Sequence, residues 1–130
     1  MSSLSDYGEG AILDHLFGIA AMAQPTLYIA VSTADPTDAG TGVAEPLGNG
    51  YARIATASSD WQRTDNVVDN VNELSFPEAT GSWGTLTHIA IFDAASGGNM
   101  IAHAALGTSK AIAANETLRF PVGNITFSMD

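Results

Sequence analysis

The stretch from Trp83 to Leu106 constrains the fold more than any other part of the chain. It reads WGTLTHIAIFDAASGGNMIAHAAL. Two runs of alternating residues flank DAASGGN, a segment rich in turn-forming residues that contains a Gly pair. Alternation with a period of two is typical of a β-strand, and a Gly-containing loop between two such runs is typical of a β-hairpin. The stretch therefore predicts an antiparallel hairpin around which the other strands pack.

Large side chains recur on both faces of the first arm of this hairpin. One face is predicted to carry Leu86, His88, Ala90 and Phe92. The opposite face is predicted to carry Thr85, Thr87, Ile89 and Ile91. Bulk on both faces is typical of a strand with neighbours on either side. We therefore expect a central strand that is covered fully on one side and partly on the other.

The rest of the chain from residue 25 to residue 130 is predicted to be mostly strands joined by Gly, Asn and Pro turns. Alternating runs occur at residues 26–33, 51–57, 71–77, 117–122 and 125–129, and the last two are expected to pair as a second hairpin. Residues 34–50 lack periodicity and predict a long surface loop, residues 59–70 are ambiguous, and residues 107–117 are less regular. About eight strands predict an all-β antiparallel β-sandwich, of the jelly-roll kind. An immunoglobulin-like sandwich is the alternative, although its Cys, Trp, Cys pattern is absent.

Residues 1–24 differ from this pattern and form a separate N-terminal arm. Asp6 and Glu9 stand where acidic residues favour a helix start, apolar residues recur at helical spacing, and Gly18 can end the helix. The spacing predicts a short helix over residues 6–18. This helix either caps the open end of its own sandwich or docks on a neighbouring subunit.

Charge and composition exclude several classes of protein. The net charge is −10, with 14 acidic residues against four Lys and Arg, so neither a nucleic-acid footprint nor a polybasic membrane anchor is expected. The chain has no Cys, which removes disulfides, thiol nucleophiles and Cys-ligated zinc. Its longest apolar run, Ile19 to Ala23, is too short to span a bilayer, and no basic segment near the N-terminus suggests a secretory signal.

Candidate catalytic and metal-binding residues are scattered. His88 and His103 lie on opposite arms of the hairpin, but no acidic residue stands beside either at a spacing typical of metal ligands. Acidic residues between positions 60 and 73 lack the spacing of a calcium loop and predict a solvated face. Trp61 and Trp83 either stack on a sugar or anchor the ends of the sandwich. We therefore expect no catalytic residue, no metal and no cofactor, and a protein that is not an enzyme.

Several segments resemble small virion proteins of tailed bacteriophages, which are usually labelled tail-fibre proteins and include β-sandwich proteins that act as capsid cement. The most specific of them are LYIAVSTADPTDAGTG, GYAR and WGTLTHIAIFDAASGGN, and the similarity runs nearly from end to end. None of these segments is a catalytic motif. The resemblance therefore implies a structural role and carries over no active-site residue.

Within this group we expect a capsid decoration (cement) protein, because a fibre shaft is built from repeats or heptads and the chain has neither. The resemblance implies a place on the capsid exterior of the virion, assembly in the host cytoplasm, and the major capsid protein as partner, with self-association as a dimer or trimer. A tail-fibre or receptor-binding module that contacts the host surface is the alternative. The expected interface residues lie in the arm and the long loop: Leu4, Tyr7, Ile12, Leu16, Phe17, Asp35, Asp38, Glu45 and Asn49.

Overall fold

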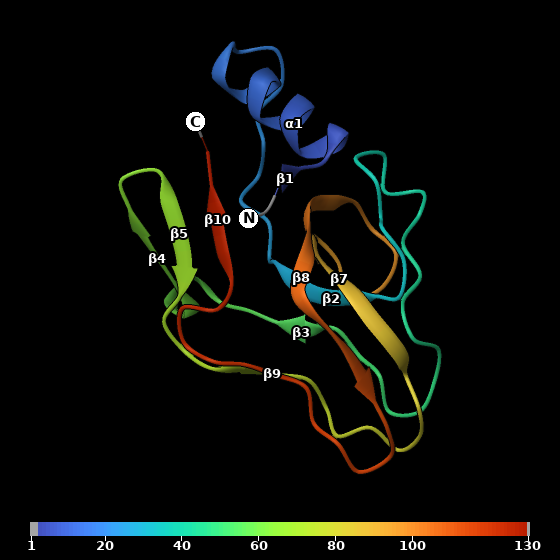
Figure 1. Cartoon of the computed structure of the whole chain (residues 1–130). Coiled ribbons are helices and arrows are strands. Elements are labelled where there is room, and N and C mark those ends of the chain that lie inside the picture. Colours follow the sequence, from blue (N-terminus) through green and yellow to red (C-terminus); the bar gives the residue numbers. More distant parts are fainter. Residues whose placement is uncertain (1–2, 130) are drawn as a thin grey trace.

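The central hairpin is present. In the computed structural model, which describes residues 3–129, β7 (Gly84–Phe92) and β8 (Met100–Ile112) pair antiparallel. Within the described residues they belong to a five-stranded sheet of order β1-β8-β7-β2-β3 (Figure 1). The other members are β1 (Ser3–Leu4), β2 (Tyr28–Ser32) and β3 (Ile54–Ala55). The first arm of the hairpin, β7, is therefore the middle strand, as its bulky faces predict.

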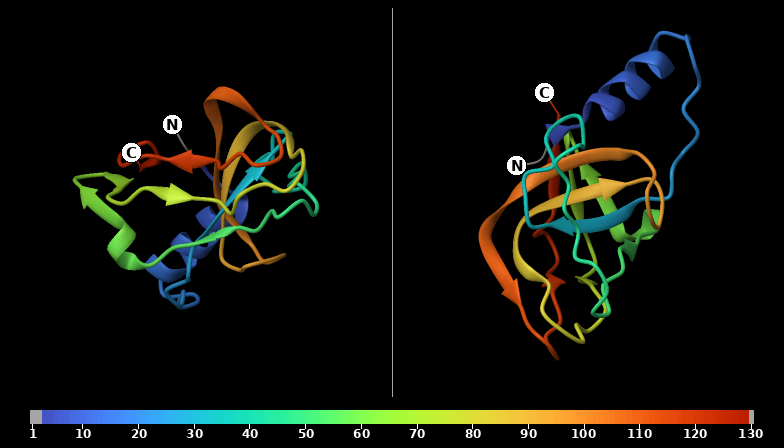
Figure 2. Two further views of the ribbon diagram at one scale, coloured as in Figure 1. Left: turned by 90° about the horizontal axis from the view of Figure 1, so that it is seen from below. Right: turned by 90° about the vertical axis from the view of Figure 1, so that its right-hand side faces the viewer.

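Two smaller sheets lie across one face of the five-stranded sheet, as two views at right angles show (Figure 2). One has the order β10-β5-β4 and consists of β10 (Thr126–Ser128), β5 (Val67–Asn70) and β4 (Trp61–Thr64). A short 3₁₀ helix (Ser58–Asp60) precedes β4. The other pairs β6 (Leu74–Ser75) with β9 (Arg119–Phe120). All these pairings are antiparallel, and the one α-helix of the described residues is α1 (Asp6–Leu16). The predicted all-β class is confirmed, while the jelly-roll topology stays a prediction.

The main core fills the space between these layers. Ile29 and Val31 of β2 are fully buried in it, as the alternation in residues 26–33 predicts. Trp83 is 3 % exposed and meets Tyr51 edge to face at 5.3 Å between ring centroids. Its indole Nε1 donates to the carbonyl of Asn49 at 2.9 Å, so the ring's one polar atom is satisfied. This tryptophan is an anchor of the sandwich and offers no exposed platform for a sugar.

The predicted face of Leu86 on β7 is wrong. Leu86 packs in the main core together with Ile89 and Ile91, whereas Ala90 and Phe92 form a second cluster on the other face. The cause is a shift in pairing register: Leu86 lies opposite Lys110, but His88 lies opposite Ala105, so β8 carries extra residues between the two pairs. Such an irregularity redirects side chains between faces, and strict alternation along one strand cannot reveal it.

The expected C-terminal hairpin is also wrong. β9 pairs with β6, and β10 pairs with β5, so the last two alternating runs join different sheets. Asn70, which is fully buried, provides the physical reason. Its side chain donates to the carbonyl of Pro121 at 3.0 Å and accepts from the backbone N–H of Ile125 at 2.9 Å, and its carbonyl accepts from Gly123. The turn is therefore fastened to β5, which holds the two runs apart.

Strand lengths differ from expectation as well. β8 continues to Ile112, through part of the stretch expected to be irregular, whereas β3, β6 and β9 contain two residues each. The described residues form ten strands, more than the expected number of about eight. The ambiguous segment 59–70 is the β4–β5 hairpin, which turns at Asp65 with a φ of 53°. Alternation indicates which residues are buried, but it does not fix how far a pairing extends.

Candidate interaction surface

The N-terminal helix forms close to where the sequence predicts it. α1 spans Asp6–Leu16, and the Ser5 hydroxyl caps it by accepting from the N–H of Gly8 at 3.0 Å. Acidic Asp6 in the first turn suits the helix dipole. Gly18 follows the helix with a φ of 74°, a conformation that Gly adopts without steric cost.

The first turn of α1 is fastened to the five-stranded sheet. β1 pairs with β8, and the hydroxyl of Ser5, 1 % exposed, donates to the carbonyl of Met100. Gly8 is also buried, and a Cβ on it would lie 2.5 Å from the carbonyl oxygen of Ile101, so only Gly fits at this contact. The base of the helix therefore belongs to its own domain, in line with the capping alternative.

The far end of the helix projects away from the sheets (Figure 2). Leu13 is 54 % exposed, Leu16 71 %, Phe17 76 % and Ile19 74 %. Residues 13, 16 and 17 stand at spacings of three and four, which places them on one side of the helix. We call these four residues the helix-tip patch. Clustered large apolar side chains in contact with water are typical of an interaction site.

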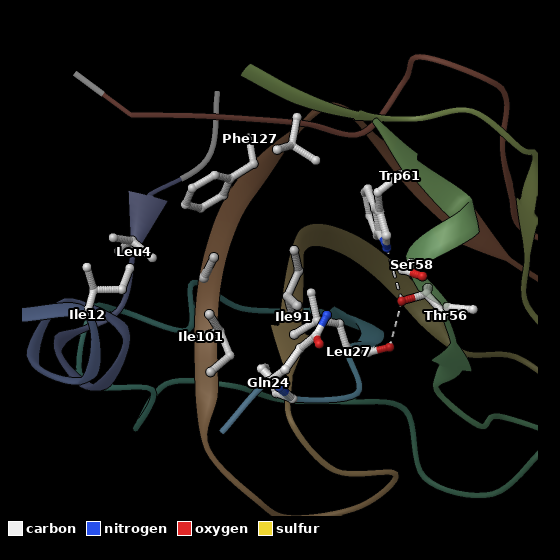
Figure 3. A pocket seen from close by; sticks show the side chains of 14 residues that line it. Leu4, Ile12, Gln24, Leu27, Thr56, Ser58, Trp61, Ile91, Ile101 and Phe127 are labelled. Carbon is white, nitrogen blue, oxygen red and sulfur yellow. Dashed lines mark hydrogen bonds between the residues drawn. The ribbon is translucent and has the colours of Figure 1, made fainter. Parts of the chain in front are cut away.

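An apolar groove lies between the helix and the sandwich. It has a volume of about 410 Å³, and it is open between α1, the five-stranded sheet and the β4–β5 and β10 strands (Figure 3). Its lining contains no charged residue; it includes Leu4, Ile12, Leu27, Trp61, Ile91 and Phe127. The indole Nε1 of Trp61 donates to the hydroxyl of Thr56 at 3.1 Å, so the ring presents its apolar surface. We call this feature the α1 groove.

The long loop at residues 34–50 contains no helix or strand, as predicted, but it lies against the outer face of the five-stranded sheet (Figure 2). Asp38 Oδ1 lies 2.8 Å from Nε2 of His103 on β8, and its carbonyl accepts from the N–H of Asp6. Asp35 Oδ1 lies 4.0 Å from Nε2 of His88 on β7. Each of these histidines therefore faces a carboxylate of the loop.

A buried ion pair fixes the second half of that loop. Arg53 donates two hydrogen bonds to Glu45, from Nε to Oε1 at 2.8 Å and from Nη2 to Oε2 at 2.9 Å. The Arg53 side chain is 4 % exposed. Burial alone would raise the pKa of Glu45, but hydrogen bonds from Arg53 and Tyr51 and the charge of Arg53 hold that pKa below its ordinary value. Burial and the bond to Glu45 raise the pKa of Tyr51. Arg53 therefore keeps the half-buried Glu45 ionised in the folded protein.

The structure separates the expected interface residues into three groups. Leu16 and Phe17 are in the helix-tip patch, and Tyr7 is 45 % exposed on the same helix. Leu4 and Ile12 line the α1 groove. The loop residues make internal contacts: Glu45 binds Arg53, Asp35 and Asp38 face histidines, and the Asn49 amide donates to the carbonyl of Ser82 at 3.0 Å. Their role at an interface, and the division of the chain at residue 24, stay predictions.

Sequence reasoning missed members of both the helix-tip patch and the α1 groove. Leu13 and Ile19 belong to the helix-tip patch. The sequence did indicate them, because positions 12, 13, 16, 17 and 19 are all apolar and together surround most of the helix. Trp61 and Phe127 of the α1 groove carried no such signal, because only the packing of β4 and β10 brings them opposite the helix.

Centres for chemistry are not evident in the part of the chain that the structure describes. Among residues 3–129, no three His, Asp or Glu side chains come close enough together to hold a metal ion. Asp60 of the acidic stretch accepts from the N–H of Ala57 and from the amide of Asn72, and these bonds lower its pKa. Within the same range, no helix has the length and apolar character needed to cross a membrane.

A family comparison gives this surface its context. The sequence model of the family described as Podophage GP4 fiber I protein gp80 matches residues 3–128, nearly the whole chain. The chain belongs to the gp80 family. Membership confirms the predicted resemblance to small structural proteins of tailed phages, and it identifies a phage virion structural protein. A search of curated proteins gave no match.

Proposed function

We propose that this gp80-family member is a structural subunit of the virion's fibre apparatus that attaches to a neighbouring protein through α1. The helix-tip patch carries the proposal. Burying one large apolar side chain contributes about 1.5–3 kcal/mol relative to leaving it in water. Leu16, Phe17 and Ile19 are each more than two-thirds exposed, so their burial by a neighbour would supply a favourable contribution that the isolated chain lacks.

The printed description of the family, a fibre protein, supports the fibre rather than the capsid shell as the place of attachment. The absence of repeats and heptads does not contradict this, because a small β-sandwich can sit at the base or tip of a fibre whose shaft another protein forms. Catalysis plays no part in this proposal, since the family is structural and the helix-tip patch offers only apolar contact.

Capsid decoration is the second candidate, and the fold itself favours it. A single compact sandwich with a fastened, projecting helix can bridge adjacent copies of the major capsid protein, and many weak contacts would then act together by avidity. In that case the loop residues Asp35, Asp38, Glu45 and Asn49 would face the shell on the capsid exterior. The proposal includes self-association as a dimer or trimer, because fibres and capsomers both supply such symmetry axes.

Localisation on the particle tests both candidates. The experiment is cryo-electron microscopy of purified virions, with an antibody fragment against this chain as a marker. We expect marker density on the fibres or at their junction with the particle. Density spread over the head surface would replace the fibre proposal with decoration. Purified virions that contain no copy of the chain would overturn both.

A further inference from the structure

We propose that the partner of the helix-tip patch is a different virion protein that offers an apolar groove with a rim of Lys and Arg. This inference rests on the proposed function and specifies its partner. The apolar part follows from the shape of the patch. Leu13, Leu16 and Phe17 form a ridge on one side of a helix, and such a ridge fits an apolar groove as amphipathic helices do in other complexes.

The charges around the patch determine what surrounds that groove. Asp6, Glu9 and Asp14 lie on α1, whose one ionisable base is His15. The first Lys or Arg in the sequence is Arg53, and its guanidinium is bound to Glu45. The helix therefore presents apolar side chains beside unneutralised carboxylates, and a partner with basic residues at the groove's rim satisfies both features.

The same charges argue against a second copy as the occupant. Two helices from identical chains that meet at their tips would bring the carboxylates of Glu9 and Asp14 together, whereas contacts between copies elsewhere on the chain are not affected. Like charges that face one another across an interface oppose association. No Lys or Arg lies on α1 to offset this repulsion: Arg119 is paired with Glu73, and Arg63 and Lys110 belong to β4 and β8.

The anchored first turn of α1 preorganises the ridge for binding. Ser5 caps the helix and bonds to β8, and Gly8 packs on the carbonyl of Ile101, so the helix is already formed and oriented in the free protein. Binding then costs little ordering entropy, and affinity is limited mainly by the contacts at the tip. Substitutions at the tip should therefore change affinity without changing the fold.

The experiment uses phage particles that lack this chain, prepared from a deletion strain, with the purified chain added back. Binding is measured by co-sedimentation from about 0.05 to about 0.5 M NaCl, a range over which exposed charges become screened. The wild type should bind, and its affinity should fall as salt rises. Phe17→Glu should lose about tenfold or more, because it puts a charge on the ridge. Leu47→Glu is the matched control, since Leu47 is 92 % exposed in the long loop, and it should bind like the wild type.

The double variant Glu9→Gln/Asp14→Asn tests the basic rim. It should flatten the dependence of affinity on salt, whereas Asp65→Asn in the β4–β5 turn should leave it unchanged. Circular dichroism melts of every variant verify the fold.

Wild-type chain that does not bind the particles overturns the proposed function. Wild-type binding that Phe17→Glu retains overturns the docking of the ridge, and salt-independent binding overturns the basic rim. Dimerisation of the wild type in sedimentation equilibrium that Phe17→Glu abolishes would make a second copy the occupant.

Discussion

Arg53 is the side chain whose removal should destabilise this domain most among its four Lys and Arg residues. Its guanidinium binds Glu45 through two nitrogens and donates from the third to the carbonyls of Ala94 and Gly97 at 2.7 and 2.9 Å. Its Cζ also lies 3.8 Å from the centre of the Phe92 ring. One side chain thus joins the long loop, the hairpin loop and the outer face of β7. The perturbation is Arg53→Met, which keeps the aliphatic packing and removes every one of these bonds.

The expected cost follows from what the substitution leaves behind. Removing one partner of a buried ion pair costs about 3–5 kcal/mol, because the other charge stays buried. Glu45 has a side chain 21 % exposed and keeps the hydrogen bond from Tyr51 at 2.7 Å, so part of its charge stays solvated. We therefore expect the lower part of that range, about 3 kcal/mol, with the freed loop carbonyls hydrated by solvent.

Urea unfolding at neutral pH, followed by the fluorescence of the two Trp residues, measures this cost. Arg63→Met is the matched control: Arg63 donates one bond to the carbonyl of Asp65 at an exposed turn, so its loss should change stability by less than about 0.5 kcal/mol. A double-mutant cycle with Glu45→Gln should show coupling, because the second substitution removes the charge that Arg53→Met leaves unpaired. A cost below about 1 kcal/mol, or simple additivity in the cycle, would refute the reasoning.

Four further outcomes are expected. The lowered pKa of Glu45 means that its contribution to stability is complete above its ordinary pKa of 4.5 and is lost as pH falls through the folded value; Glu45→Gln should therefore show a shallower loss of unfolding free energy in acid than the wild type. Phe92→Ala should lower the free energy of unfolding in urea by about 3–5 kcal/mol, because the ring is buried. A loss below about 1 kcal/mol would mean that this ring is not buried beneath the Arg53 guanidinium. Gly8→Ala should increase amide hydrogen exchange in α1, because its Cβ would displace the helix from the sheet; unchanged protection would contradict that contact. Deletion of residues 1–24 should leave a cooperative thermal melt but abolish co-sedimentation with particles, whereas loss of the melt would make the helix an essential cap of its own domain.

Sequence patterns predicted the elements of this fold better than their partners. The hairpin, α1, β2 and the long loop all followed from local periodicity and turn residues, because each is decided by neighbours in the chain. The partner strands of β9 and β10 did not, since the side chain of Asn70 decides them from 50 or more residues away. Nothing about an Asn in an acidic segment distinguishes a fully buried one from a solvated one.

The site shows the same division. The apolar tip of α1 can be predicted from helical spacing, but its exposure cannot, because exposure depends on what the rest of the chain leaves uncovered. Sequence alone predicted that Asp38 and Glu45 lie on a long surface loop and contact a partner. The structure engages them with His103 and Arg53, residues that no spacing rule connects to that loop.

The manner in which α1 is fastened has a mechanical consequence. Its attachments to the sheet are concentrated at one end: the short β1–β8 pairing, the Ser5 hydroxyl on β8, and the backbone bond from Asp6 to the long loop. A force applied at Leu16 and Phe17 therefore acts on the sheet through the attachments at residues 3–8. A sideways pull at the tip acts first on these few bonds, and it reaches β2, the neighbour of β7, only through residues 18–27, which form no helix or strand. Loss of the β1–β8 pairing would therefore release the base of the helix while the β7–β8 hairpin stays paired.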